Sequence, residues 1–147
     1  MSKISYFFCI IFLLSACQQT KKGEVNAKEK GEESDFELYE MSEMAVLMED
    51  MYTHHEKQKA LLVKGEAPGA FPEDLLRIHT ATFTDPADND SLFKSWARLY
   101  IQYEKNSYTD PANAVTHYNN AVNVCIMCHQ QKCTGPIPRI KKLLIAE

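Results

Sequence analysis

The chain contains few residues that break or restrict regular structure, with 5 Gly and 6 Pro among 147 residues. This scarcity excludes collagen-like and mucin-like chains, and a hydrophobic content of 45% excludes a wholly disordered one. No segment alternates apolar and polar residues with a period of two, so the sequence predicts no β-strand. Basic residues are not in excess either, since the net charge is −4. That balance argues against a nucleic-acid-binding face.

The apolar run near the N-terminus is too short to cross a membrane. It spans Tyr6 to Leu14, nine residues, whereas a membrane-spanning helix needs about 20. With the positive charge of Lys3 before it, the run is typical of a signal peptide. The next residues, Leu14-Ser15-Ala16-Cys17, resemble the lipobox of bacterial lipoproteins, in which the Cys thiol is lipidated. We therefore expect a signal peptide over residues 1–16 and an acyl anchor on Cys17, which binds the chain to membrane lipid.

The segment after this cysteine lacks the hydrophobic residues that a folded core requires. Residues 18–34 contain one Val, one Ala and no larger hydrophobe, so a flexible tether is predicted over 17–34. One folded domain over 35–147 follows. The expected location is the bacterial cell envelope, facing the periplasm. Gln18 stands where many inner-membrane lipoproteins carry Asp, which favours the outer membrane.

Two of four predicted helices precede residue 84. The first is expected to begin at Ser34 or Asp35 and to end at Gly65, which would take the C′ position. Its apolar stripe has helical spacing and comprises Met41, Met44, Met48, Met51 and His55. A shorter helix is predicted from Pro72 to about Phe83.

The other two predicted helices follow residue 90. The third runs from about Ser91 to Lys105, and its predicted core face carries Leu92, Trp96, Leu99 and Tyr103, with Phe93 and Tyr100 beside it. The fourth starts at Asp110-Pro111, with Asp110 as the capping carboxylate. Its stripe comprises Val115, Tyr118, Val122, Cys125 and His129.

Four amphipathic helices with short connections predict an all-α fold, an antiparallel four-helix bundle. In such a bundle the end of the fourth helix lies beside the start of the first. A short C-terminal extension follows Thr134-Gly135-Pro136. We expect Ile140, Leu143 and Leu144 to fold back as a lid over the end of the bundle.

The motif that carries chemistry is Cys125-Ile126-Met127-Cys128-His129. If Cys9 is removed with the signal peptide and Cys17 is lipidated, three thiols remain, and three cannot all pair within one chain. On a helix, Cys125 and Cys128 project to one side and can form thioethers with the two vinyl groups of haem. His129 then reaches the iron as the proximal ligand. One covalent haem c is therefore the expected cofactor.

Two other readings of these thiols remain open. A thioredoxin-like redox site would need a strand before the motif, and none is predicted. A zinc or iron–sulfur site would use Cys125, Cys128 and Cys133 together with His129 or His117. Zinc ligands usually come in separated pairs, whereas here three thiols fall within nine residues.

The position of the motif resembles the class II c-type cytochromes, the cytochrome c′ family. These proteins are four-helix bundles with Cys-x-x-Cys-His close to the C-terminus and the distal residue on the first helix. A softer similarity is Val63-Lys64-Gly65-Glu66-Ala67-Pro68, like the turn that ends the family's first helix. The chain departs from the family at Cys133, where a basic residue is common, and in its continuation to Glu147. Cys133 is expected to be a buried helix-end residue, a free thiol or an intermolecular disulfide.

The resemblance implies a distal ligand on the first helix. Counting back from Lys64-Gly65 places it at Met48, whereas counting forward from Tyr39 gives Met44; Met51 is the other alternative. A methionine stripe is also ordinary core filling. His54 and His55 are less favoured ligands, and His79 and His117 have no sequence reason to approach the iron. Arg139, Lys141 and Lys142 are expected either to pair with haem propionates or to face water.

The function expected from these features is one-electron transfer by a membrane-tethered, periplasmic, monohaem c-type cytochrome, an electron carrier and not an enzyme. The alternative within the family is a five-coordinate haem protein that binds nitric oxide or carbon monoxide. A non-haem lipoprotein with thiol or metal chemistry is a third reading. The expected partners are a redox protein of unknown identity and, because the family often dimerises, a second copy of the chain.

Overall fold

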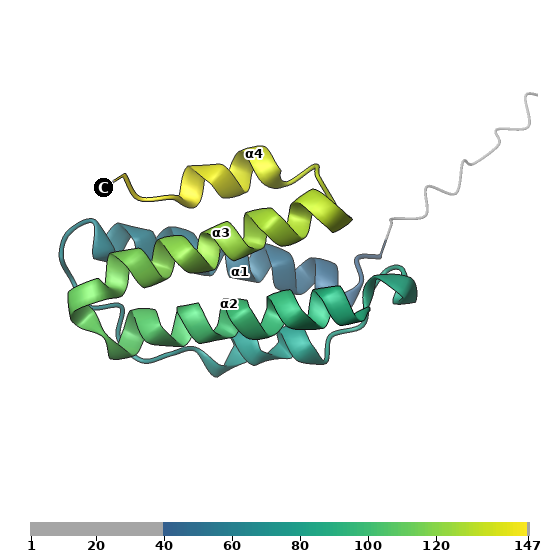
Figure 1. The fold of residues 1–147 in the computed structure, drawn as a ribbon, viewed down its shortest axis with the longest axis horizontal. Helices are drawn as coiled ribbons and strands as arrows, with labels where there is room; N and C mark the ends of the chain where they lie inside the picture. Colours follow the sequence, from purple (N-terminus) through teal and green to yellow (C-terminus); the bar gives the residue numbers. More distant parts are fainter. Residues whose placement is uncertain (1–39, 147) are drawn as a thin grey trace, which may run out of the picture. The chain divides into compact units, whose positions relative to one another are not determined.

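The computed structural model describes residues 40–146, and within this range the chain is helical with no β-strand (Figure 1). The all-α fold class is thereby confirmed. Cys17, the signal peptide and the tether lie outside the described residues. Among the described helices, none has the length and apolar character to span a membrane. The elements are α1 (Glu43–Leu62), η2 (Glu73–His79), η3 (Pro86–Asp88), α2 (Ser91–Thr109), η4 (Pro111–Asn113), α3 (Ala114–Lys132), α4 (Ile137–Ile140) and η5 (Lys141–Leu143).

Helix α1 begins at Glu43, so the predicted start near Asp35 is wrong. Ser42 caps the helix, and its Oγ accepts a hydrogen bond from the backbone N–H of Ala45 at 3.2 Å. Thr82 adds two further bonds. Its carbonyl oxygen accepts from the N–H of Met44 at 3.0 Å, and its own N–H donates to the Glu43 carboxylate at 2.9 Å. Because these partners satisfy groups of the first turn, the helix is anchored to begin here.

The end of α1 follows the prediction. Gly65 has φ +72°, a left-handed conformation that favours glycine. Its N–H donates to the carbonyl of Leu62, and the N–H of Glu66 donates to the carbonyl of Leu61, both at 3.0 Å. This pair of bonds is the Schellman motif, with Gly65 at C′.

The second predicted helix is a short 3₁₀ segment, η2, instead of an α-helix reaching Phe83. Only seven residues separate Pro72 from Thr80, and no side chain caps the segment. In a 3₁₀ helix, residues three apart lie directly above one another. Leu75 and Ile78 therefore share one face, and both are buried against α1 and α2.

Helix α2 is one turn longer than predicted and buries a different face. The Asp90 carboxylate caps it by accepting from the N–H of Phe93 at 2.8 Å. The predicted core face is displaced by about one position, because Leu92 is 43% exposed and Trp96 is only half-buried. The buried face comprises Phe93, Ala97, Tyr100, Ile101, Glu104 and Ser107.

Helix α3 starts after the short η4 turn. The carboxylate of Asp110 does not cap the backbone, contrary to the prediction. It accepts instead from the side chain of Asn113 at 2.8 Å and lies 3.2 Å from Nε2 of His117. Tyr118 and Val122 are fully buried, so the predicted core stripe of this helix is confirmed in its middle.

The C-terminal segment, residues 137–145, packs along α3 and against α1 (Figure 1). The fold-back is confirmed, with Ile140 and Leu143 buried, but the segment runs beside α3 instead of capping the end of the bundle. It is held by four hydrogen bonds to its backbone carbonyls and one to a backbone N–H. The Lys59 side chain donates to the carbonyls of Lys142 and Leu144, and the Tyr118 hydroxyl donates to that of Leu143. The Asn119 side chain donates to the carbonyl of Ile145 and accepts from the N–H of the same residue.

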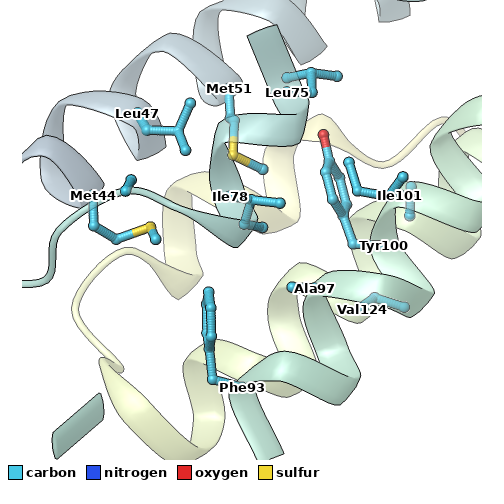
Figure 2. Packing of buried hydrophobic residues seen from close by; sticks show 12 residues of the cluster. Met44, Leu47, Met51, Leu75, Ile78, Phe93, Ala97, Tyr100, Ile101 and Val124 are labelled. Atoms are coloured by element: carbon cyan, nitrogen blue, oxygen red, sulfur yellow. The ribbon is translucent and has the colours of Figure 1, made fainter. Parts of the chain in front are cut away.

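The core consists of two apolar clusters. The larger one joins α1, η2, α2 and α3, and Figure 2 shows Met44, Leu47 and Met51 of α1 among the residues that form it. The smaller one lies between α3, the end of α1 and the C-terminal segment, around Tyr118. Cys125 packs against both clusters, so the motif contacts both parts of the core.

Candidate functional site

Cys125 and Cys128 lie on the last two turns of α3 as half-buried free thiols. Three residues span about 300° of helix, so both sulfurs project to the same side. Burial raises the pKa of Cys125 to about 12, and the negative charge of Glu104 adds to this effect. Burial also raises the pKa of Cys128, while the ammonium of Lys132 opposes the rise. Both groups are therefore neutral thiols at pH 7.

His129 ends the motif, and its imidazole is oriented by the chain itself. The ring Nδ1 lies 2.8 Å from the carbonyl oxygen of Cys133. A carbonyl can only accept, so Nδ1 carries the proton and donates it. In the neutral ring, Nε2 then holds the free lone pair. A backbone carbonyl on the second nitrogen is the usual way in which a metal-ligating histidine is fixed.

Met48 faces the same space as His129. Three cavities, of about 60, 40 and 390 Å³, share both residues in their linings. The first lies between α1, α3 and the C-terminal segment, and the other two lie between α1, α2 and α3. Met51 lines the two smaller cavities, and Met44 lines the largest. All three predicted distal candidates therefore lie beside the space that His129 lines. Among residues 40–146, Met48 is the methionine that lines all three cavities.

The walls of this space suit a large planar apolar group. Phe93, Trp96 and Tyr100 of α2 line the second cavity together with Cys125 and Cys128. The indole N–H of Trp96 is buried and has no hydrogen-bond partner within the described part of the chain. A donor in that condition normally has a partner. An acceptor on a bound group could satisfy it, and the thiol, imidazole and aromatic side chains around this space are of the kinds that hold a haem.

The rim of the space carries paired charges. Lys132 contacts Asp90 at 2.6 Å and Asp88 at 3.4 Å. On the other side, Arg139 makes two hydrogen bonds to Glu49, at 2.7 and 3.0 Å, and its guanidinium lies 4.0 Å from the centre of the Tyr52 ring. Of the three predicted propionate candidates, Arg139 lines the first cavity, whereas Lys141 and Lys142 are exposed.

The other histidines have partners away from the motif. His54 lies 3.1 Å from the carboxylate of Glu104, and His55 is buried with Nε2 3.2 Å from the hydroxyl of Tyr100. His55 also borders the first cavity. His117 pairs with Asp110, and His79 is exposed.

Glu104 is a functional candidate that sequence reasoning missed. It is fully buried on the inner face of α2, whereas the core face predicted from the sequence lies about one position away. The available signal was its spacing, since Phe93, Ala97, Tyr100 and Glu104 recur at intervals of four, three and four. A count of apolar residues alone does not detect this buried face, because its last two members, Glu104 and Ser107, are polar.

The structure lends no support to the other thiol chemistries. Within residues 40–146, no three or more His, Cys, Asp or Glu side chains are grouped to hold a metal ion. Cys133 is exposed, and His117 lies near the opposite end of α3 from His129. A thioredoxin-like site requires a lowered thiol pKa, whereas both motif thiols have raised values.

Comparisons with family models, with curated proteins and with solved structures find no match to this chain. The candidate site therefore rests on its own geometry.

Proposed function

We propose that this chain is a monohaem c-type cytochrome of the bacterial cell envelope that transfers one electron at a time. The observation that carries the proposal is the arrangement of His129. Its Nδ1–H is held by the Cys133 carbonyl, its Nε2 lone pair is free, and Met48 lines the same three cavities. These residues lie beside Cys125 and Cys128, at the spacing of haem attachment.

The residues present would hold the haem in a defined way. The thiols of Cys125 and Cys128 would each be joined to one vinyl group through a new carbon–sulfur bond, with the thiol hydrogen passing to the other vinyl carbon. His129 would supply a nitrogen ligand and Met48 a sulfur ligand to the iron, with Met44 and Met51 as alternatives to Met48. When bound, haem supplies a reversible Fe(III)/Fe(II) couple.

The protein would tune that couple through ligation, burial and charge. Neutral thioether sulfur and imidazole nitrogen are the axial ligands that raise haem potentials in electron carriers. Trp96 and Phe93 would shield a bound haem from water, and the hydrogen bond to the Cys133 carbonyl would increase the basicity of His129 as a ligand.

The finer fold and the location also belong to the proposal. We propose a cytochrome c′-like antiparallel four-helix bundle in which η2 takes the place of the second helix. Cys17 would be lipidated and would anchor the domain to the membrane through residues 17–34. The proposed partners are a redox protein of unknown identity and a second copy of the chain.

The visible absorption spectrum tests the proposal. The full chain is expressed in a bacterium with and without its haem-attachment machinery, and the spectrum is recorded oxidised, reduced, and reduced under carbon monoxide. We expect covalent haem only with the machinery, and sharp low-spin bands that resist the gas. A high-spin spectrum that converts under carbon monoxide would indicate the gas-binding alternative. Absence of haem bands would refute the cytochrome assignment.

Membrane attachment is tested separately with Cys17→Ser. The wild-type chain should sediment with membranes and label with a radioactive fatty acid. The variant should lose the label while keeping its haem spectrum. A wild-type chain that takes up no label would contradict the anchor alone.

A further inference from the structure

A buried polar cluster lies between α1 and α2, apart from the Cys-x-x-Cys-His motif. Its centre is Glu104, whose side chain has no exposed surface. One carboxylate oxygen, Oε1, lies 3.1 Å from Nε2 of His54, and the other, Oε2, lies 3.9 Å from Nδ1 of His55. A carboxylate without access to water requires such partners. Two adjacent histidines of α1 serve one carboxylate of α2.

Each histidine also meets a tyrosine of α2. The hydroxyl of Tyr108 lies 3.0 Å from Nε2 of His54, and that of Tyr100 lies 3.2 Å from Nε2 of His55. The titratable groups that face Glu104 from the elements around it are His54 and His55 of α1, Tyr100 and Tyr108 of α2, and Tyr118 and Cys125 of α3.

Nε2 of His54 lies within hydrogen-bond distance of two groups. A proton on Nε2 is donated to the Glu104 carboxylate, whereas an unprotonated Nε2 would accept from the hydroxyl of Tyr108. Nδ1 of His55 and Oε2 of Glu104 are both buried and have no hydrogen-bond partner among the described residues. Among the described residues, the hydrogen bond that the Glu104 carboxylate makes is therefore the one to His54.

His54 gives a proton of this cluster a route to solvent. Its side chain is 23% exposed, whereas Glu104 is completely enclosed. His55 is the less suitable carrier, because burial lowers its pKa and keeps its ring neutral, although Glu104 opposes that shift. His54 is therefore the histidine of this pair that has access to solvent, and it is hydrogen-bonded to Glu104.

The cluster adjoins the candidate haem site. His55 lines the cavity that Met48, Cys125 and His129 also line. The charge of Glu104 contributes to the raised pKa of Cys125, so the carboxylate acts electrostatically on the attachment residue. Charges inside a protein interact more strongly than in water.

We propose that Glu104 and His54 form a redox-linked proton site, at which one proton binds when the haem gains an electron and leaves when the electron leaves. This inference rests on the proposed function. The electron comes from an external one-electron donor and the proton from solvent, so each reduction adds one of each and no bond to carbon changes. Reduction removes one positive charge from the iron, which favours a proton nearby.

The test is the midpoint potential of the full-length holoprotein, titrated with dithionite between pH 5 and 8. Imidazole exchanges its proton in this range. The wild-type reduction equilibrium constant should fall by up to about tenfold per pH unit. Glu104→Gln keeps a hydrogen-bond acceptor for His54. In this variant the midpoint potential should no longer vary with pH, while the visible spectrum should be unchanged.

The matched control is Asp110→Asn. It removes the carboxylate of another histidine pair, 3.2 Å from His117 at the far end of α3, and should keep the wild-type slope. His54→Gln is the second variant, to be used if Glu104→Gln does not fold. Its midpoint potential should also be independent of pH.

A wild-type potential that does not vary with pH, or a slope that survives either cluster variant, would overturn the redox-linked proton site while leaving the cytochrome proposal intact. A chain without covalent haem would overturn both.

Discussion

The imidazole of His129 donates its Nδ1 proton to the backbone carbonyl of Cys133, one helical turn further along the chain. The bond uses only the main chain of Cys133, whose thiol is exposed. The N–H of Cys133 in turn donates to the carbonyl of His129 at 3.1 Å. The helix end thus orients the His129 ring without any contribution from the third thiol.

This relationship separates the roles of the three cysteines. Cys133→Ser should keep one covalent haem per chain and an unchanged spectrum, because serine preserves the carbonyl. Cys125→Ser or Cys128→Ser should each leave a single thioether, since one vinyl group remains unreacted. The position of the α-band in alkaline pyridine counts the remaining vinyl groups. Loss of haem from Cys133→Ser would show that the thiol itself takes part.

The distal role of Met48 can be tested by opening the site. In Met48→Ala, carbon monoxide should bind to the reduced protein at least about tenfold more tightly, because no sulfur competes for the iron. Titration of the reduced protein with the gas, followed by absorption, measures this change. Unchanged affinity would exclude Met48 as the ligand.

Met44→Ala and Met51→Ala are the controls for that experiment. Both residues are buried, so each variant should lose about 2–5 kcal/mol of stability through the cavity that it creates. Carbon monoxide affinity should stay at the wild-type value in both. An increase confined to one of them would transfer the distal assignment to that residue.

The C-terminal segment should depend on Asn119. This side chain donates to the carbonyl of Ile145 and accepts from its N–H, both at 2.9 Å. Asn119→Ala leaves those backbone groups without their partner and should lower the free energy of unfolding by about 1–3 kcal/mol. Asn113→Ala, at an exposed position of η4 where the lost hydrogen bond is to the partly exposed Asp110 carboxylate, should cost less than about 0.5 kcal/mol. Urea unfolding of the two variants measures the difference.

His55 should make the domain sensitive to acid. Burial lowers its pKa in the folded state, so below about pH 6.5 the unfolded chain binds more protons than the folded one. Stability should therefore fall with decreasing pH, by up to about 1.4 kcal/mol per pH unit until the folded-state pKa is reached.

The measurement compares urea midpoints at pH 7.5 and 5.5. His55→Gln should lower stability at both values but show a smaller difference between them. His79→Gln, at an exposed histidine, should keep the wild-type difference. An equal acid effect in His55→Gln would assign it to another group.

Sequence patterns predicted those elements that local chemistry determines. Gly65 ends α1 because a left-handed residue is required there, and the apolar spacing of α3 places Tyr118 and Val122 in the core. The start of α1 could not be predicted locally. It depends on hydrogen bonds from Thr82, almost 40 residues away in sequence.

The buried face of α2 shows a second limit. Apolar counting selected Leu92 and Trp96, yet the inner face runs through Glu104 and Ser107. Those polar residues are buried because α1 supplies partners for them, such as Gln58, whose side chain donates to Ser107 at 2.8 Å. Only the packing of two helices reveals such pairing. The same limit hid the histidine–carboxylate cluster, although each member was visible in the sequence.

The C-terminal segment also controls access to the space beside His129. Lys59 and Leu144, joined at 2.8 Å, are 85 positions apart in the chain. Ile140 and Leu143 of this segment line the first cavity beside His129. One wall of that cavity is therefore held in place by a long-range contact, and detachment of the segment would expose the motif on α3 from that side.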